Sequence, residues 1–358
     1  MSYCKILFFS FLIFFKAGSR EKDLEKTNLK ILHLTFHIGM EKEIQSIGNA
    51  LGLNITTIQA LSLFKDYKGT ESPLNITHDK ANFAFEKYQS VFDQYDLIIT
   101  SDTAPLSRIF LQNDWEKKVV VWICNRFDWD TYDAEYYTLF SEGLKKDNFL
   151  IIPFTNFEPY YAQKNHLPLH EKVIKPCSLY MNLSNEPDSI NSWAFLSKRI
   201  LDVQTNFDLS YELRKIEVPY VSFSFSNPED QMTNVKYNGV ICFPYQFSLI
   251  QIFESMALGL PVYVPTPNFL SLLFKEGYFI QLPEFWDKNL IFEYGEMYQE
   301  EFKDCYIYFD SFKDLKTKIF DTSNWQEKRI KIKEVMKVHQ EKTLQRWEEV
   351  FNWAKEKN

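Results

Sequence analysis

The segment from residue 240 to 264 constrains the fold most strongly, because it alternates between strand, loop, helix and strand. Val240 to Phe243 is a short apolar run, typical of a strand buried in a parallel sheet. A helical pattern from Leu249 to Leu258 follows, and Gly259 and Pro261 end it. A second apolar run completes the segment. Because two strands joined by a helix need a right-handed crossover beside a parallel sheet, the segment predicts an α/β fold.

The helix and the turn after it also carry a motif, Glu254-Ser-Met-Ala-Leu-Gly-Leu-Pro-Val262. This motif resembles the C-terminal domain of GT-B glycosyltransferases, whose signature is an acidic residue followed by Met-Ala-x-Gly-x-Pro-Val. The resemblance implies that Glu254 binds ribose or sugar hydroxyls of a nucleotide-sugar donor. Many retaining members carry a second Glu eight residues earlier, where this chain has Gln246, which can hydrogen-bond a hydroxyl but brings no charge. An ordinary βαβ unit in which Glu254 pairs locally is the alternative.

The length of 358 residues predicts two domains rather than one compact core. In residues 20–165, apolar strand patterns alternate with helical patterns, which predicts a doubly wound parallel sheet. The expected strands are 28–37, 54–58, 96–100, 118–124 and 149–153, and the expected helices are 41–51, 81–95 and 104–111. The segment 156–170 is polar and aromatic and suits a linker or a domain-closing loop.

Residues 166–322 form the second predicted domain, again α/β. Its expected strands are 220–225, 239–243, 261–264 and 306–309, and helices are expected around 190–203. Residues 323–358 predict one long helix that packs back on the body, opened by a capping box at Ser323 to Gln326. The resemblance implies the same layout: two Rossmann-like domains facing across a cleft, an acceptor domain followed by a donor domain, with a C-terminal helix that crosses back.

Residues 1–19 have the pattern of a secretory signal. Lys5 leads into the apolar stretch Ile6 to Phe15, and Ala17 to Ser19 offers small residues for cleavage. The apolar core is shorter than the roughly 20 residues of a membrane span, but Lys16 leaves a short signal anchor open. We therefore expect a lumenal protein of the endoplasmic reticulum or Golgi, or a secreted one, contacting the membrane only if the leader stays.

Three sequons are consistent with this destination, since all could accept a glycan in a eukaryotic secretory pathway. They begin at Asn54, Asn75 and Asn182. Cleavage would leave four cysteines, enough for two disulfides. For Cys124 and Cys242, which end apolar strand patterns, we expect buried thiols instead.

The chemistry of the N-terminal domain is expected at the ends of its strands, which line the crevice of such sheets. His37 and Gly39 follow the first strand, where a helix N-terminus favours an anion. His37 is a candidate general base, as the His of the first loop is in some GT-B families; a structural or substrate-contacting role is equally open. Asp102, Asn125 and Arg126 follow the third and fourth strands and are candidate acceptor or phosphate contacts.

Acidic residues surround Arg126 and leave two alternatives. Arg126 could instead form a salt bridge with Asp128, Asp130 or Asp133. Asp128-Trp-Asp130 also has the Asp-x-Asp form with which metal-dependent GT-A glycosyltransferases hold a divalent cation. The GT-B resemblance implies no metal cofactor. The sequence has no zinc-type Cys/His spacing, no P-loop and no Gly-x-Gly-x-x-Gly.

The loop before the Glu254 helix, Tyr245, Gln246, Phe247 and Ser248, would offer backbone N–H groups and a helix N-terminus to the donor diphosphate. Lys175 and Lys236 are candidate basic partners or solvated surface residues. The net charge of −8 and the absence of a broad basic patch disfavour nucleic acid as a partner.

The sequence therefore predicts a glycosyltransferase, a hexosyl- or related transferase, that moves a sugar from a nucleotide-sugar donor to a glycan, glycoprotein or other hydroxyl acceptor. The alternative from another class is a secreted two-domain protein, or a glycosyltransferase-like one, that binds a ligand without chemistry. The donor sugar, the acceptor and the stereochemical outcome do not follow from the sequence.

Overall fold

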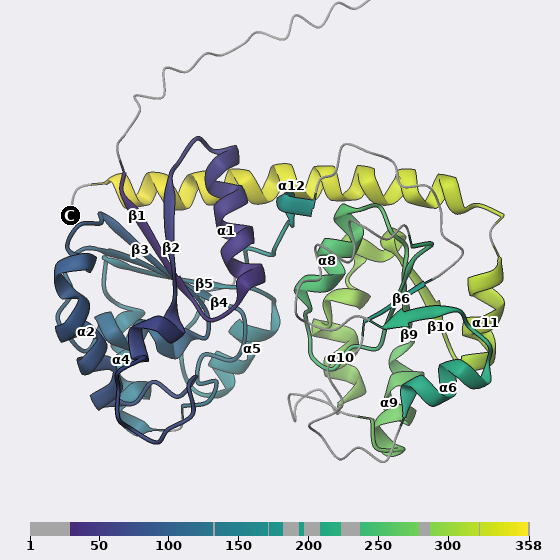
Figure 1. Ribbon diagram of the computed structural model, residues 1–358, viewed down its shortest axis with the longest axis horizontal. Helices are drawn as coiled ribbons and strands as arrows, with labels where there is room; N and C mark the ends of the chain where they lie inside the picture. Colours follow the sequence, from purple (N-terminus) through teal and green to yellow (C-terminus); the bar gives the residue numbers. More distant parts are fainter. Residues whose placement is uncertain are drawn as a thin grey trace, which may run out of the picture.

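The computed structural model describes residues 29–131, 133–170, 172–181, 193–196, 208–222, 237–278, 287–321 and 323–356. The predicted leader, Asn182 and Lys236 lie outside the described residues. The described chain forms two parallel five-stranded sheets, each in its own domain, and one long helix that crosses both domains (Figure 1). None of the described helices has the length and apolar character that crossing a membrane would require.

The first sheet has the strand order β2-β1-β3-β4-β5. Its strands are β1 (Ile31–Thr35), β2 (Ile55–Gln59), β3 (Leu97–Asp102), β4 (Lys118–Ile123) and β5 (Phe149–Pro153). Its helices are α1 (Ile38–Ala50), α2 (His78–Phe92), α3 (Arg108–Leu111), α4 (Ala134–Gly143) and α5 (Phe157–Lys164), with the 3₁₀ turns η1 (Ala60–Phe64) and η2 (Ala104–Ser107). Every residue of β1 and β4 is buried, as expected of central parallel strands covered on both faces.

The second sheet has the order β10-β9-β8-β6-β7. Its strands are β6 (Trp193–Leu196), β7 (Tyr220–Ser222), β8 (Val240–Cys242), β9 (Val262–Pro265) and β10 (Tyr306–Phe309). Its helices are α6 (Leu209–Lys215), α8 (Ile250–Ala257), α9 (Pro267–Lys275), α10 (Lys288–Tyr294) and α11 (Phe312–Phe320), with the 3₁₀ turns η3 (Leu179–Met181), η6 (Glu296–Tyr298) and η7 (Glu300–Cys305). Numbered from its own first strand, the second sheet has the same strand order as the first. The strand order therefore reverses between β1 and β3 in the first sheet and between β6 and β8 in the second.

The helix α12 (Trp325–Lys355) joins the cores of the two domains. Ile332 and Met336 near its start pack into the core of the second domain. Trp347 packs edge-on against Trp122 of β4, with 5.2 Å between ring centroids, and Phe351 joins the same core of the first domain. The predicted fold class, α/β with two doubly wound parallel sheets and a long C-terminal helix, is confirmed.

Three local predictions are wrong. Residues 193–196 form the strand β6 between β7 and β8, within the segment 190–203 for which helices were expected. Residues 157–164, expected to be loop, form α5, because Phe157 and Ala162 are buried against their surroundings. The capping box at Ser323 is absent: the Ser323 hydroxyl donates to Asp321, and the N-cap of α12 is Asn324, which makes no side-chain capping bond.

The four described cysteines are thiols rather than disulfides: Cys124, Cys177, Cys242 and Cys305. Cys242 is a buried thiol, as expected, whereas Cys124, directly after β4, is a thiol that is only half-buried.

Candidate interdomain site

The first turns of α1 and α8 meet between the two domains. A Cβ atom placed on Gly39, in the first turn of α1, would lie 3.3 Å from Cδ1 of Ile250, the first residue of α8. The domains also meet where the rings of Phe157 in α5 and Phe247 in the loop after β8 stack, with centroids 3.8 Å apart. All these residues follow the carboxyl ends of strands. The two sheets therefore turn their carboxyl ends toward one another, which is where open α/β sheets bind ligands.

On the first domain, His37 and Asp102 flank the point between β1 and β3 where the strand order reverses. His37 is exposed and caps α1, with Nδ1 accepting the Gly39 N–H at 3.0 Å. Asp102 ends β3 with a left-handed backbone, at φ 76°. Burial raises the pKa of the Asp102 carboxyl, and the nearby His37 partly offsets this rise. A residue held at positive φ costs conformational energy, which is found most often at functional sites.

Arg126 and its acidic neighbours form a packed cluster after β4. Arg126 Nε lies 3.8 Å from Asp128 Oδ1, and the guanidinium lies over the Tyr161 ring at 5.1 Å. Asp128 is 2% exposed and accepts hydrogen bonds from the hydroxyls of Tyr137 and Tyr161. These contacts correspond to the salt-bridge alternative for Arg126. Asn125, next to Arg126, is half-buried.

The two carboxylates of the Asp-x-Asp motif have different partners. Asp128 is held by the two tyrosines, whereas Asp130 accepts the Ser72 hydroxyl at 2.6 Å. Within the described residues, no group of three or more His, Cys, Asp or Glu side chains is placed to hold a metal ion. Asp133, the third acid predicted as a salt-bridge partner of Arg126, forms its ion pair with Arg108 instead.

On the second domain, Glu254 lies on the inner face of α8 and is 2% exposed. Its Oε1 accepts the hydroxyl of Tyr180 at 2.6 Å. Tyr180 belongs to η3, which packs on both α1 and α8. It lies in residues 172–181, which we call the interdomain linker. Burial and the nearby Glu254 raise the pKa of the Tyr180 phenol, which therefore stays a donor across the physiological range.

The loop before α8 divides between packing and exposure. Tyr245 is 9% exposed and Phe247 is used by the interdomain stack, while Gln246 is half-buried. Ser248 is buried, and within the described part of the chain its hydroxyl has no hydrogen-bond partner. Ser248 directly precedes Leu249, the N-cap of α8, so its hydroxyl is available to a water or a ligand at this helix start.

Sequence reasoning missed Glu43 in α1. Its side chain is fully buried, and its two oxygens accept the backbone N–H groups of Cys177 at 2.6 Å and Ser178 at 2.9 Å. These amides lie in the interdomain linker, more than 130 residues away in sequence. The one available signal was an acidic residue beside the apolar stripe of Ile44 and Ile47, which alone indicates only a solvated helix edge.

A second missed acid is Glu158 in the first turn of α5. It is 4% exposed, and one oxygen accepts both the N–H and the hydroxyl of Thr155, at 2.5 and 2.6 Å. Burial raises the pKa of Glu158 to about 8, against the two bonds from Thr155, which lower it. Perturbed carboxyl groups at such crevices are candidates for proton transfer.

The sequons differ in accessibility. Asn54 is exposed just before β2. Asn75 is half-buried in the loop before α2, and its carbonyl accepts a bond from Lys80.

Comparisons with known proteins add limited information. Neither a scan against protein-family models nor a search of curated proteins found a match. Among solved structures, the chain is similar to a DNA-modifying β-glucosyltransferase determined with and without uridine diphosphoglucose, at TM-score 0.45 and 9% identity, covering 91% of this chain and 99% of that one. It is also similar to the glycosyltransferase SnogD from Streptomyces nogalater, at TM-score 0.42 and 11% identity, covering 86% and 95%.

Proposed function

We propose that this chain is a GT-B glycosyltransferase that transfers a sugar from a nucleotide-sugar donor to a hydroxyl group of a glycan or another acceptor. The observation that carries the proposal is the contact between the first turns of α1 and α8. Helix α1 follows β1 and helix α8 follows β8, and each of these strands borders the point where the strand order of its sheet reverses. Two helix N-termini that face the same space favour a diphosphate. A buried carboxylate, Glu254, lies one turn behind the second of them.

In the donor half, Glu254 would exchange one hydroxyl partner for another. Its present partner is the Tyr180 phenol at 2.6 Å, and a ribose or sugar hydroxyl would make a bond of the same kind. Ser248 and the first-turn N–H groups of α8 would hold the diphosphate. Gln246 would hydrogen-bond a donor hydroxyl without adding charge. The donor site would therefore differ from that of the retaining GT-B enzymes that carry a second Glu at this position.

In the acceptor half, His37 would take the proton of the attacking hydroxyl. Because Nδ1 accepts the Gly39 N–H, the neutral ring carries its proton on Nε2. The ring must therefore release this bond, and Nδ1, the nitrogen that carries no proton, would then act as the base. Asp102, close enough to His37 for the two charges to interact, would stabilise the imidazolium that forms.

The leaving diphosphate would be stabilised by helix dipoles and backbone N–H groups rather than by a metal ion. EDTA should then leave turnover unchanged, measured with the purified chain and any donor that it hydrolyses. If EDTA abolishes turnover and Asp130→Asn does the same, the metal-dependent GT-A alternative is correct. Asp128→Asn alone is ambiguous, because Asp128 also holds Tyr137 and Tyr161.

We also propose that the protein resides in the lumen of the endoplasmic reticulum or Golgi, or is secreted. It rests on the leader pattern and on the exposure of Asn54. Expression in a eukaryotic cell, followed by N-glycosidase treatment and a gel, tests it. A chain that keeps Met1 and shows no mobility shift would contradict it.

Donor binding and chemistry are separated by two measurements on the same panel of nucleotide sugars. Thermal shift identifies the donor that binds, and release of free nucleotide identifies turnover with water or an added glycan. We expect both from one donor. Binding without turnover would instead support the alternative, a glycosyltransferase-like binding protein, and the absence of both would contradict the proposal.

A further inference from the structure

His33, in the middle of β1, is a fully buried histidine that the proposed reaction does not use. Its Nε2 lies 2.8 Å from the hydroxyl oxygen of Ser101 in β3. Its Nδ1 lies 3.4 Å from the hydroxyl oxygen of Thr57 in β2. Because β2 and β3 flank β1 in the sheet, the side chain of His33 connects three adjacent strands.

The direction of these hydrogen bonds follows from the charge of the ring. Burial lowers the pKa of His33 to about 3, so the ring is neutral across the physiological range and has one donor and one acceptor nitrogen. The Thr57 hydroxyl oxygen already accepts the side-chain N–H of Gln45 at 3.4 Å, which leaves its own proton for Nδ1. His33 Nε2 therefore carries the ring proton and donates it to the hydroxyl oxygen of Ser101.

The bond to Ser101 joins β1 and β3 beyond the end of their backbone pairing. The register between these two strands ends at Leu34 and Thr100. On its other side, β3 stays paired with β4 through Asp102. Since β1 and β3 border the point where the strand order reverses, the bond from His33 holds the end of β3 against β1 at this point.

Both candidate reacting groups of the first domain are attached to these two strand ends. Asp102 directly follows Ser101 and has a left-handed backbone, at φ 76°. His37 donates its backbone N–H to the hydroxyl oxygen of Thr35, the last residue of β1, at 3.2 Å. A strained backbone persists only where the surrounding structure holds it firmly. The position of Asp102 relative to His37 therefore depends on how the end of β3 is held against β1.

We propose that His33 is a positioning residue for the transferase reaction, which through its bond to Ser101 holds Asp102 in its strained backbone and at a fixed position relative to His37. This inference rests on the proposed function, in which His37 takes the acceptor proton and Asp102 stabilises the imidazolium. His33 is buried and acts only through Ser101. Because the donor is held by the second domain, loss of the bond should slow the reaction without weakening donor binding.

The kinetic test compares Ser101→Ala with Thr100→Val, its matched control. Thr100 is the preceding residue of β3, is equally buried, and its hydroxyl has no hydrogen-bond partner within the described residues. Ser101→Ala should lower kcat about tenfold or more, while the Kd of the donor changes less than about twofold. Thr100→Val should leave both values unchanged. Equal kcat values for the two variants, or a loss of donor affinity in Ser101→Ala with kcat unchanged, would overturn the proposal.

Substitutions of His33 itself assign the effect to its ring. His33→Gln keeps an amide donor for Ser101 and should retain most of the native kcat. His33→Leu fills the space without a donor and should show the same loss of kcat as Ser101→Ala. A kcat loss in Ser101→Ala that His33→Leu does not share would mean that the bond from His33 has no part in the reaction.

The titration of the Asp102 carboxyl provides a measurement that does not depend on turnover. Burial raises the pKa of Asp102, and the nearby His37 lowers it. Burial also holds the pKa of the neighbouring Cys124 thiol well above its usual range, so that thiol does not titrate together with Asp102. Carbon NMR of the chain with labelled aspartate follows the carboxyl, and Asp102→Asn identifies its signal.

The pKa of Asp102 should fall toward the ordinary aspartate value in Ser101→Ala, because the released end of β3 exposes the carboxyl. In Thr100→Val it should equal that of the native chain. An unchanged pKa in Ser101→Ala would overturn the positioning role. If the pKa falls as expected but the native chain transfers no sugar from any donor, the proposed transferase function fails while the positioning of Asp102 by His33 stands.

Discussion

Two buried glutamates, one in each domain, hold the linker between the domains in different ways. Glu43 is the sixth residue of α1 and Glu254 the fifth residue of α8, and both helices begin at the interdomain contact. Glu43 accepts two backbone N–H groups, from Cys177 and Ser178. Glu254 accepts the side-chain hydroxyl of Tyr180, only two residues further along.

This difference separates an anchor from a binding group. A backbone N–H cannot leave Glu43 unless the linker itself moves, and its desolvation would then cost free energy. A phenol can leave Glu254 by rotation of one side chain, and a ligand hydroxyl can replace it. We therefore propose that Glu43 stabilises the domain arrangement and that Glu254 exchanges its hydroxyl partner for a ligand.

The largest effect is expected for Glu43→Ala, which should lower the free energy of unfolding by about 3 kcal/mol. The variant leaves two buried amides without an acceptor and opens a cavity. Burial raises the pKa of the Glu43 carboxyl, and this desolvation penalty in the native protein offsets part of the stabilisation that its two hydrogen bonds give. Denaturant unfolding measures the change.

The matched control for that measurement is Glu86→Ala, a glutamate on the exposed face of α2. It should change the unfolding free energy by less than about 0.5 kcal/mol. Equal losses for the two variants would mean that Glu43 is no anchor, and the contrast with Glu254 would collapse.

A smaller effect, on ligand affinity rather than stability, is expected for Glu254→Gln. It should weaken donor binding by about 1–3 kcal/mol, since a charged hydrogen bond becomes neutral. The amide keeps an acceptor for Tyr180, so the thermal midpoint should change little. Glu293→Gln, an exposed glutamate of α10, is the control. A variant that loses stability but keeps its donor affinity would reverse the assignment.

The exchange itself is tested by Tyr180→Phe, with an expected effect of about 1 kcal/mol. The ring stays in place while the hydroxyl that competes with the donor is removed. Donor affinity should therefore increase about fivefold, measured by calorimetry, while stability falls slightly. Weaker donor binding would show that Tyr180 positions Glu254 for the donor rather than occupying it in the empty site.

Most strands of the first domain could be predicted because they are continuous β-branched runs, such as Val119 to Val121. The strand β6 could not, since Trp-Ala-Phe-Leu contains no β-branched residue and its conformation depends on pairing with β7 and β8. The same limit applies to α5, whose Pro and aromatic residues suggested a loop. There, packing against the other domain decides the structure.

The candidate site shows the same division. The strand-end positions of His37 and Asp102 follow from the alternation of strands and helices, and Glu254 follows from its motif. The role of Glu43 depends on amides 134 and 135 residues away, and no local pattern encodes such a distance. Arg126 was open in the sequence because several acids lay within reach, and only the packing of Tyr161 and Asp128 distinguishes among them.

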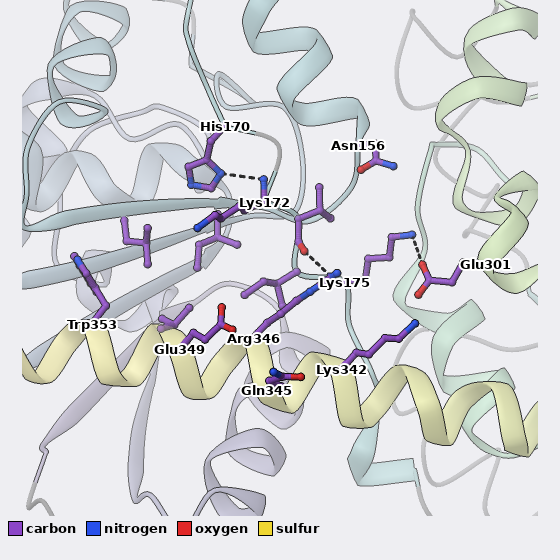
Figure 2. A pocket seen from close by; sticks show the side chains of 15 residues that line it. Asn156, His170, Lys172, Lys175, Glu301, Lys342, Gln345, Arg346, Glu349 and Trp353 are labelled. Carbon is purple, nitrogen blue, oxygen red and sulfur yellow. Dashed lines mark hydrogen bonds and ion pairs between the residues drawn. The ribbon is translucent and has the colours of Figure 1, made fainter.

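The smallest effect is expected for Glu301, a third glutamate that contacts the linker, through its ion pair with Lys175 at one end of the cavity between β5, the linker and α12 (Figure 2). Its side chain is 38% exposed. Contact with the His339 ring, at 3.5 Å, and the ion pair with Lys175 lower its pKa to about 2. A carboxyl group with a lowered pKa stabilises the folded state at pH values above the ordinary pKa near 4.5, and this stabilisation is lost as the pH falls from there toward 2.

The difference in thermal midpoint between the native chain and Glu301→Gln should therefore be largest near pH 6 and shrink at pH 3. Solvent screening keeps it small throughout. Glu341→Gln, at an exposed position of α12, is the matched control. If the difference in thermal midpoint stays constant between pH 6 and pH 3, Glu301 stabilises the linker through packing and not through its ion pair with Lys175.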